Sequence, residues 1–425
     1  MIRQLAVPPF ERLDPFLPKP SMVDGPTRAA VAEILADVAA RGDAAVRDWS
    51  RKFDGADLGP TEWELPRATW EAALERLPAA LRDALEAAVA RVRVYHARQR
   101  DPGFTLVEDD GTVLGMRVQP LERVGLYVPG GKAAYPSSVI MNAVPASVAG
   151  VDQIIAVTPP SGITDAVLAA CYLSGVTRLY RIGGAQAVGA LAYGTQTITR
   201  VDKIVGPGNK WVAEAKRQVV GRVGIDMFAG PTEVLIIADA SADPIRVAAD
   251  MIAQAEHDED ACAWLVTTDQ RLADQVPAAL DRQLANHSRR AVAEVSLKRN
   301  GAVILVPTMN DAVAVANLRA PEHLEIVTRD PEAIAAGIRH AGAIFLGDET
   351  PEPVGDYIAG PSHVLPTSGT ARYASPLGVY DFVHRTSIIR YTRERLDHDA
   401  ARIIALAEAE GLPGHAAAVR VRGES

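Results

Sequence analysis

The sequence contains little cysteine, few aromatic residues and no long apolar run, and each shortage excludes a class of protein. Two cysteines among 425 residues cannot form a disulfide framework, so a reducing compartment is expected. Aromatic residues make up only 5% of the chain, which favours helix-rich α/β layers over a β-sandwich. No apolar run reaches the roughly 18 residues that a membrane helix requires, and prolines and charges interrupt the N-terminus where a secretory signal would be apolar. We therefore expect a soluble cytoplasmic protein.

An excess of positive charge is also lacking. The formal net charge is −9 at pH 7, which argues against broad binding to nucleic acid or to an anionic membrane. The length allows two to four domains, and a hydrophobic content of 48% supplies sizeable cores. We therefore expect a globular protein of two to four domains.

The order of the apolar segments predicts an α/β fold with two Rossmann-like parallel sheets. Residues 26–98 show helical periodicity, 103–115 suggest a short polar hairpin, and 393–411 suggest a last helix. Between them, short apolar runs alternate with helical segments, which is typical of parallel βαβ units. Strands are predicted at 124–129, 153–158, 178–182 and 202–205, and then at 233–238, 264–267, 302–306 and 343–346. The two similar halves suggest a duplication, although no sequence repeat demonstrates it.

Glycine-containing turns follow three predicted strands of the first half. They contain Gly130-Gly131, Gly183-Gly184 and Gly206-Pro207-Gly208-Asn209. Each leads from a strand into a helix, where phosphate groups often bind. None matches the G-x-G-x-x-G fingerprint of a dinucleotide site. Three such turns along one sheet edge predict a ligand that lies over the strand ends.

Gln254 and His257 stand three residues apart near the end of a predicted helix. The helix is expected to begin with Asp243 as N-cap and Pro244 as its first residue. Residues three apart share a helix face, so an amide oxygen and an imidazole nitrogen could converge on a metal ion. Glutamine is an uncommon zinc ligand, however, and a histidine at the negative end of a helix explains the same pattern.

Glu322 and His323 directly follow Pro321. Histidine titrates near neutral pH and a neighbouring carboxylate raises its basicity, so the pair suits general acid/base catalysis. A second acid and imidazole, Asp356 and His363, belong to a glycine- and proline-bounded loop. Such loops often carry sites but also serve as plain turns.

Glu410 and His415 flank a tight turn near the C-terminus. On spacing alone they are equally typical of a solvated chain end. No single one of the four groups of polar residues identifies a function.

Together, these segments resemble the histidinol dehydrogenase family, which catalyses the last step of histidine biosynthesis. The resemblance extends from about residue 26 to the tail. Several segments carry it in the same order: GLYVPGG, IGGAQAVGALAYGT, KIVGPGNKWV, DMFAGPTEVLIIAD, MIAQAEHDED, APEHLEI and GDYIAGPSHVLPTSGTARY. So many ordered matches make chance improbable.

The resemblance implies NAD-dependent oxidation of L-histidinol, through L-histidinal, to L-histidine. Two hydrides pass to two NAD molecules, and one Zn2+ per subunit orients the substrate. A nitrogen and oxygen ligand set accepts manganese as well. The resemblance also implies a homodimer with shared active sites. It implies no nucleic-acid partner and no membrane partner.

Site residues follow from the matching motifs. The implied zinc ligands are Gln254, His257, Asp356 and His415, the last supplied by the partner subunit. Glu322 and His323 are implied as the catalytic pair. The substrate contacts implied are Thr232, Gln254, His257, His323, Asp356, His363, Glu410 and His415. The NAD contacts implied are Tyr127, Gln186 and Asn209.

The sequence departs from the family pattern at a few positions. Thr232 stands where many relatives have serine, which keeps the hydroxyl and adds a methyl group. Pro361-Ser362 precedes His363 in place of Thr-Asn, and Pro376-Leu377 is also less usual. None of these changes removes an implied metal ligand or the Glu322–His323 pair.

Four parts of the chain are expected from the resemblance. They are an N-terminal arm at 1–20, a discontinuous α/β domain at 21–115 plus 232–375 with the metal and catalytic residues, an inserted Rossmann-like NAD-binding domain at 116–231, and a dimer-crossing segment at 376–425. Periodicity alone would predict three sequential blocks.

Other functions compete with this interpretation. A paralogous dehydrogenase of another small polar alcohol, such as a sulfonated diol, would be expected to change the substrate-contacting residues. A zinc hydrolase would need a metal-bound water but no nucleotide site, so the three glycine turns disfavour it. A non-catalytic NAD-binding or scaffold protein would need neither a metal set nor the Glu322–His323 pair.

Overall fold

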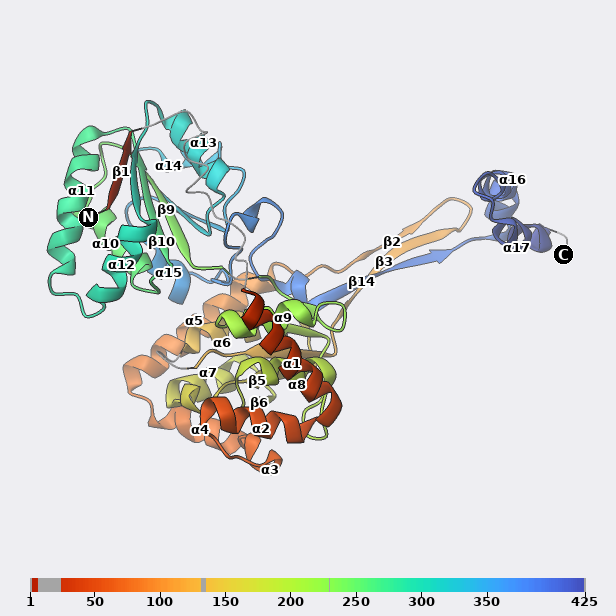
Figure 1. Ribbon diagram of the computed structural model, residues 1–425. Helices are drawn as coiled ribbons and strands as arrows, with labels where there is room; N and C mark the ends of the chain where they lie inside the picture. Colours follow the sequence, from red (N-terminus) through yellow and green to blue (C-terminus); the bar gives the residue numbers. More distant parts are fainter. Residues whose placement is uncertain (1, 7–23, 131–134, 229, 424–425) are drawn as a thin grey trace. The chain divides into compact units, whose positions relative to one another are not determined.

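The computed structural model describes residues 2–6, 24–130, 135–228 and 230–423, and its contacts divide the chain into two units (Figure 1). The first unit comprises residues 1–99 and 121–382, and the second comprises 100–120 and 383–425. Most of the predicted arm and Gly131 of the first glycine turn lie outside the described residues. Among the helices described, none is long and apolar enough to cross a membrane.

One five-stranded parallel sheet of the first unit has the order β6-β5-β4-β7-β8. Its strands are β4 (Arg123–Tyr127), β5 (Gln153–Val157), β6 (Arg178–Tyr180), β7 (Lys203–Val205) and β8 (Gly224–Ile225). Alternate strand residues pack into separate cores, because successive side chains point to opposite faces. The helices around this sheet are α1 (Gly25–Arg41), α2 (Asp43–Asp54), α3 (Pro60–Trp63), α4 (Arg67–Arg76), α5 (Ala79–Ala97), α6 (Pro136–Ala149), α7 (Asp165–Ser174), α8 (Gly184–Tyr193) and α9 (Lys210–Gln218).

The other parallel sheet of the first unit has the order β1-β11-β10-β9-β12-β13. Its strands are β1 (Arg3–Ala6), β9 (Glu233–Ala238), β10 (Cys262–Thr267), β11 (Ala302–Leu305), β12 (His323–Val327) and β13 (Ala343–Leu346). One face packs on α10, α11 and α12, and the other on α13 and α14 (Figure 1). The helices of this half are α10 (Pro244–Ala255), α11 (Gln270–Leu284), α12 (Arg290–Asn300), α13 (Met309–Arg319), α14 (Pro331–Ala335) and α15 (Glu352–Tyr357).

Both sheets have the same strand order once β1 is set aside. Numbered along the chain, the strands of each sheet run third, second, first, fourth, fifth. The predicted α/β fold with two parallel sheets is therefore confirmed, and the shared order is what a duplication would leave. The predicted start of α10 is confirmed too, since Asp243 accepts a hydrogen bond from the Ile245 N–H at 2.8 Å.

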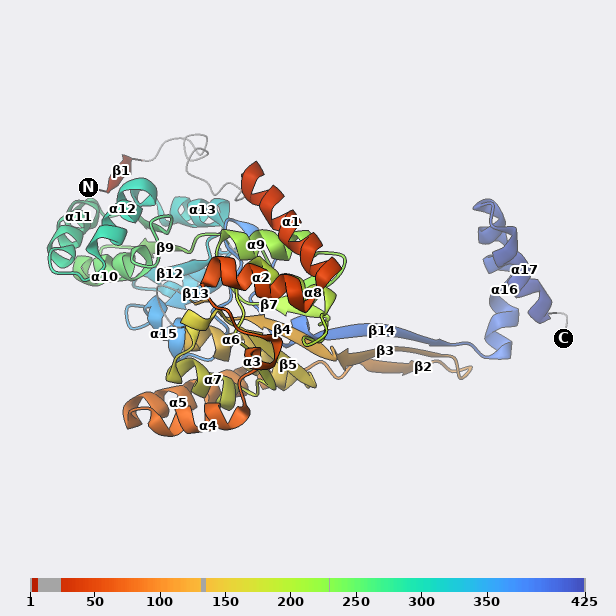
Figure 2. The ribbon, with the colours of Figure 1, turned by 60° about the horizontal axis from the view of Figure 1, so that its bottom comes forward.

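The N-terminal helices pack on a different sheet from the one predicted. The helices α1 to α5 pack with the sheet of β4 to β8, with α1 against α8 and α9 and α4 against α7 (Figure 2). The prediction that residues 21–115 join residues 232–375 is wrong for these helices. Periodicity identifies the apolar face of a helix but not the surface that covers it. Similarly, β1 from the predicted arm pairs in parallel with β11.

The second unit contains an antiparallel sheet and two helices. The sheet has the order β14-β3-β2, formed by β2 (Phe104–Val107), β3 (Val113–Pro120) and β14 (Val383–Arg390). The predicted hairpin is therefore present, but β3 continues past the predicted boundary at residue 116. The remaining helices, α16 (Arg393–Ala409) and α17 (Pro413–Gly423), pack against each other.

Candidate active site

A cavity of about 700 Å³ in the first unit is lined by residues from both parallel sheets. The segments that follow β4 and β7 contribute Gly130 and residues 206–209. Thr232, just before β9, and His323, the first residue of β12, line it as well. The carboxyl edge of one sheet thus faces the amino edge of the other across the cavity. In the β4–β8 sheet, β4 and β7 adjoin the point where the strand order reverses, and the carboxyl edge at such a point is a common ligand position.

His323 presents a free ring nitrogen in this cavity. The parallel register aligns it with Val234 of β9, and its Nδ1 lies 3.1 Å from the Glu233 carbonyl oxygen. That carbonyl can only accept, so Nδ1 carries the proton and Nε2 is the basic atom. Nε2 is buried, has no hydrogen-bond partner among the described residues, and lies 3.9 Å from Asp356 Oδ1. Burial lowers the pKa of His323 to about 4, so the ring is neutral at pH 7.

Glu322 directly precedes His323, and burial shifts the pKa of this carboxyl group upward, whereas it shifts the pKa of the imidazole downward. Its Oε2 accepts hydrogen bonds from Thr232 Oγ1 at 2.7 Å and from the Glu233 N–H at 2.9 Å. Burial raises the pKa of Glu322 well above its usual value, although both hydrogen bonds lower it. Burial thus favours the protonated form of the carboxyl group, which can donate a proton and accept it back. The hydroxyl of Thr232 makes this contact, so the methyl group that distinguishes it from serine does not remove the hydrogen bond.

Glu352 and Asp356 project from α15 four residues apart and share a helix face. Together with His323 they offer ligand atoms within 4.8 Å of one another. Burial, with Asp356 nearby, raises the pKa of Glu352 well above its usual value. Glu352 is not among the residues predicted from the sequence, although its spacing of four from Asp356 is a helical signal that points to it.

The amide of Gln254 is fully buried at the end of α10. One end of the amide lies 2.5 Å from both carboxylate oxygens of Glu352, and the other lies 2.5 Å from Thr232 Oγ1 and 2.9 Å from the Glu233 nitrogen. Hydrogen bonding is satisfied when the amide nitrogen faces Glu352 and the oxygen faces the Glu233 N–H. Gln254 thus joins Glu352 to the strand end that holds the Glu322–His323 pair.

His257 and His363 also line the cavity of the first unit. His257 is exposed, and its Nδ1 lies 2.9 Å from the Ala253 carbonyl oxygen, which leaves Nε2 as the available ligand atom. His363 is half-buried, and burial lowers its pKa although Asp356 nearby raises it. The loop before it is fixed by Ser362, whose hydroxyl donates to the Met141 carbonyl at 3.2 Å.

Two predicted site residues lie in the second unit. Glu410 is the C-cap of α16, and His415 belongs to α17. Both side chains are exposed. Of the four predicted metal ligands, His257 and Asp356 line the cavity of the first unit. Gln254 is fully buried beside the lining residues Thr232 and Glu352, and His415 belongs to the other unit.

The predicted NAD residues occupy the carboxyl edge of the β4–β8 sheet. The hydroxyl of Tyr127 accepts from the Gly184 N–H at 3.1 Å, and the side chain of Asn209 caps α9. Gln186, in α8, is fully buried, and neither of its amide atoms has a partner among the described residues. Tyr127 and Asn209 line the cavity, and Gln186 is not among its lining residues. A Cβ on Gly130 would lie 2.4 Å from the Pro159 ring, so only glycine fits this turn.

A buried ion pair that the sequence argument missed supports the Gly206 turn. Lys216 contacts Asp226 and donates to the Gly206 carbonyl at 2.8 Å. Asp226 accepts from the Gly206 N–H at 2.8 Å. The cavity thus combines a shaped glycine turn, a free imidazole nitrogen, a buried carboxyl group and a cluster of possible metal ligands.

Comparisons with known proteins cover both units. A family model described as histidinol dehydrogenase matches residues 18–423. The histidinol dehydrogenase of Dechloromonas aromatica (strain RCB) is 53% identical over 417 residues, which are 97% of this chain and 96% of the relative. That of Aquifex aeolicus (strain VF5) is 51% identical over 413 residues, which are 97% and 96%. The crystal structure of histidinol dehydrogenase from Elizabethkingia anophelis matches with a TM-score of 0.94 and 33% identity, covering 100% of this chain and 98% of that chain.

Proposed function

Since the chain belongs to the histidinol dehydrogenase family and catalyses the NAD-dependent oxidation of L-histidinol, through L-histidinal, to L-histidine, we propose that the cavity of the first unit is its active site. The observation that carries the proposal is the free Nε2 of His323, buried 3.9 Å from Asp356. A neutral imidazole with one unpartnered nitrogen is suited to accept the hydroxyl proton of an alcohol. The paralogous dehydrogenase and the zinc hydrolase are not favoured by this family membership.

The donor set fits a zinc ion. Asp356 and His257 offer oxygen and nitrogen atoms of the kind zinc binds, and Nδ1 of His257 is already held by the Ala253 carbonyl. Glu352 and Asp356 offer ligand atoms within 4.8 Å of each other and of His323, so a bound cation would compensate the carboxylate oxygens gathered there. We propose Gln254, His257 and Asp356 as three ligands and His415 of the partner subunit as the fourth. When bound, zinc holds the imidazole and amine of histidinol and fixes their orientation.

In the first oxidation, the hydroxyl proton of L-histidinol passes to Nε2 of His323. At the same time, the carbon that bears this hydroxyl group transfers a hydride to NAD. The hydrogen bond from Nδ1 to the Glu233 carbonyl stabilises the imidazolium that forms. His323 then releases its proton before the second oxidation. His363 and Glu410 are proposed to contact the substrate, as are Thr232 and the metal ligands.

In the second half of the reaction, the bound aldehyde takes up water, and Glu322 exchanges the protons of that addition. Burial raises its pKa and so favours the protonated carboxyl group, which can give up a proton and take it back during the addition. A hydroxyl of the hydrate then gives its proton to His323, while the carbon of the hydrate transfers the second hydride to a second NAD molecule. Keeping the aldehyde bound in the cavity protects a reactive intermediate from side reactions.

The NAD contacts are proposed at Tyr127, Gln186 and Asn209. The Gln186 amide is fully buried without partners among the described residues, which is costly, and it would meet NAD only if α8 or the Gly183-Gly184 turn shifts when the nucleotide binds. We expect Gln186→Met, which has a similar volume, to raise the KM for NAD about tenfold, as the loss of one or two hydrogen bonds would. The ligand-free variant should also be more stable than the wild type by about 1 kcal/mol, because the unsatisfied amide is gone.

Two measurements check the Gln186 prediction. Steady-state kinetics give the KM for NAD, and urea unfolding of the ligand-free protein gives the free energy of unfolding. The KM for L-histidinol serves as the internal control and should stay unchanged. An unaltered KM for NAD would remove Gln186 from the nucleotide site.

A homodimer is supported by the surface of the second unit. Its sheet exposes Phe104, Leu106, Val107, Ile388 and Ile389, and α16 exposes Leu406. The buried residues within α16 and α17 are only Ala407 and Ala416. A three-stranded sheet and a helix pair with so much exposed apolar surface call for a partner. We propose that the partner is a second copy of the chain, in the cytoplasm.

One assay tests substrate, stoichiometry and metal together. Purified, zinc-loaded protein is given excess NAD and limiting L-histidinol, and NADH is followed by its absorbance. We expect two NADH per histidinol, loss of activity on chelation, and recovery when zinc or manganese is restored. A folded, metal-loaded protein that forms no NADH from histidinol would overturn the proposed function.

A further inference from the structure

The backbone of Glu233 holds both residues of the Glu322–His323 pair. Its N–H donates to Glu322 Oε2 at 2.9 Å, and its carbonyl oxygen lies 3.1 Å from His323 Nδ1. Because these two contacts use the peptide groups on either side of one residue, any rotation of the Glu233 backbone would misplace the acid and the base together. The side chain of Glu233 makes neither contact.

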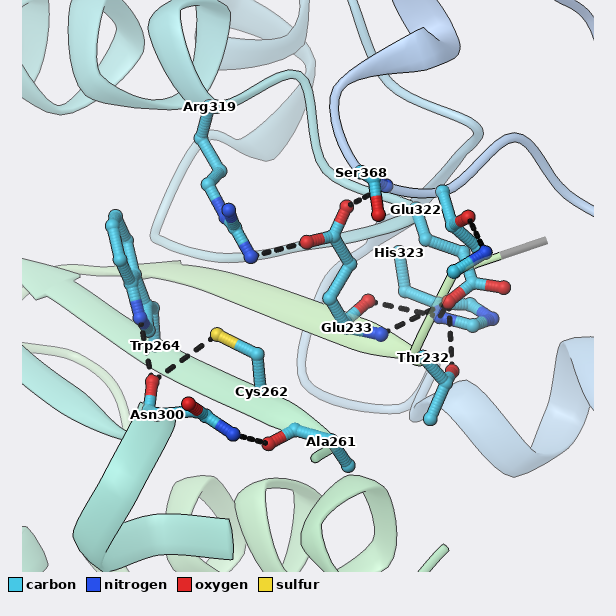
Figure 3. A network of polar contacts seen from close by, with 12 residues as sticks. Thr232, Glu233, Ala261, Cys262, Trp264, Asn300, Arg319, Glu322, His323 and Ser368 are labelled. Atoms are coloured by element: carbon cyan, nitrogen blue, oxygen red, sulfur yellow. Dashed lines mark hydrogen bonds and ion pairs between the residues drawn. The ribbon is translucent and has the colours of Figure 1, made fainter. Parts of the chain in front are cut away.

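The Glu233 side chain is tied to two other segments (Figure 3). One carboxylate oxygen contacts the guanidinium of Arg319, and the other accepts from the Ser368 N–H at 3.0 Å. Arg319 ends α13, three residues before Glu322. Its guanidinium lies over the Trp264 ring, 4.8 Å from the centroid. Glu233 and Arg319 are both buried.

Both non-glycine residues with a positive φ among the described residues adjoin this ion pair. Ala320, directly after Arg319, has a φ of 49°, and Ser368 has a φ of 55°. Such backbone conformations are unfavourable for residues with a Cβ and persist where the surroundings hold them. Arg319 directly precedes Ala320, and Glu233 accepts a hydrogen bond from the Ser368 N–H. The Glu233–Arg319 pair therefore helps to hold both backbone conformations.

We propose that Glu233 and Arg319 are positioning residues, which hold the backbone that aligns His323 and Glu322 with the substrate. This inference rests on the proposed function of the cavity. Replacing a buried ion pair by apolar groups is often neutral for stability, so stability alone gives little reason for this one. The ion pair connects β9, the end of α13 and the segment of Ser368 next to Glu322 and His323. This position gives a geometric reason for its presence.

The first test is Glu233→Gln, which keeps the shape but leaves Arg319 without its charged partner. We expect kcat to fall about 10- to 100-fold with little change in the KM for L-histidinol or NAD, because misplaced catalytic groups slow chemistry more than binding. The pH profile of kcat should also move, since the carbonyl that holds His323 shifts. Asp381→Asn is the matched control.

Asp381 resembles Glu233 in its partners but lies outside the cavity lining. It accepts from Lys203 at 2.9 Å and from the Gly378 N–H at 2.9 Å. We expect Asp381→Asn to lower the melting temperature while kcat and its pH profile remain those of the wild type. Equal kinetic losses in both variants would mean that Glu233 acts only through general stability, and would overturn the proposal.

The double variant Glu233→Gln, Arg319→Met separates charge burial from positioning. It removes the unpaired charge, so we expect the melting temperature to recover while kcat remains about 10- to 100-fold reduced. Recovery of kcat to the wild-type value would overturn the proposal. If Glu233→Gln does not fold, Arg319→Lys, which keeps the charge but not the planar fork, gives the same kinetic readout. Absence of turnover in the wild type would instead refute the proposed function.

Discussion

Replacing His323 with asparagine should lower kcat for histidinol oxidation about a thousandfold, because a positioned base contributes roughly that much to a proton transfer. The asparagine amide can still donate to the Glu233 carbonyl, but it offers no basic nitrogen where Nε2 of His323 is buried and free. Initial rates with saturating NAD and L-histidinol measure the effect. Zinc content and melting temperature, measured on the same preparation, show whether the variant is folded and loaded.

The pH dependence adds a second readout for His323. Burial lowers its pKa to about 4, and the base acts in its deprotonated form. The rate should therefore decrease only as the pH falls toward that value, well below the usual titration of histidine near 6.5. In the asparagine variant this acid limb should be absent. A variant that retains most of the wild-type kcat would show that another group takes the hydroxyl proton.

The sequence predicted the two parallel sheets well because short apolar runs and glycine turns are local signals. β9 and β13 begin and end at the predicted residues, and Asp243 caps α10. The strand that begins at His323 was not predicted, however. The segment APEHLEI was interpreted as a motif, although HLEIV is buried throughout and forms β12, an interior strand between β9 and β13. Composition alone does not distinguish a strand whose first residue is a proposed catalytic residue from a motif in a loop.

Contacts between distant segments were the part that sequence could not supply. Gln254 meets Glu352 and Thr232 only because the end of α10 and α15 both reach the amino edge of the same sheet. Likewise, Arg319 is buried against Glu233, 86 residues away in sequence. Such pairings depend on which strands are neighbours, and periodicity, although it bears on the register of a strand, does not give the strand order. The resemblance identified the motif residues, whereas Glu352, Arg319 and Lys216 emerged from the structure.

A mixture of two inactive variants should regain activity if His415 serves the active site of the other subunit. His415→Ala alone should lose nearly all activity, because a ligand supplied to the metal is missing from every site. His323→Asn alone should be similarly impaired. His415 belongs to α17 in the second unit, and His323 to β12 in the first. In a heterodimer of the two variants, one site would carry both defects and the other neither.

The size of the recovery follows from random pairing. When equal amounts of the two variants are unfolded together and refolded with zinc, half of the dimers are heterodimers and half of their sites are intact, so about a quarter of the wild-type activity should return. The control is a mixture of His323→Asn with Glu322→Gln, whose defects lie side by side in β12 and its preceding residue. Every site of that mixture keeps one defect, so no recovery is expected. If the His415 mixture also stays inactive while light scattering reports dimers, His415 acts within its own subunit. Recovery in the first mixture alone would mean that neither subunit is complete without the other, and that the apolar surface of the second unit is covered by a second copy.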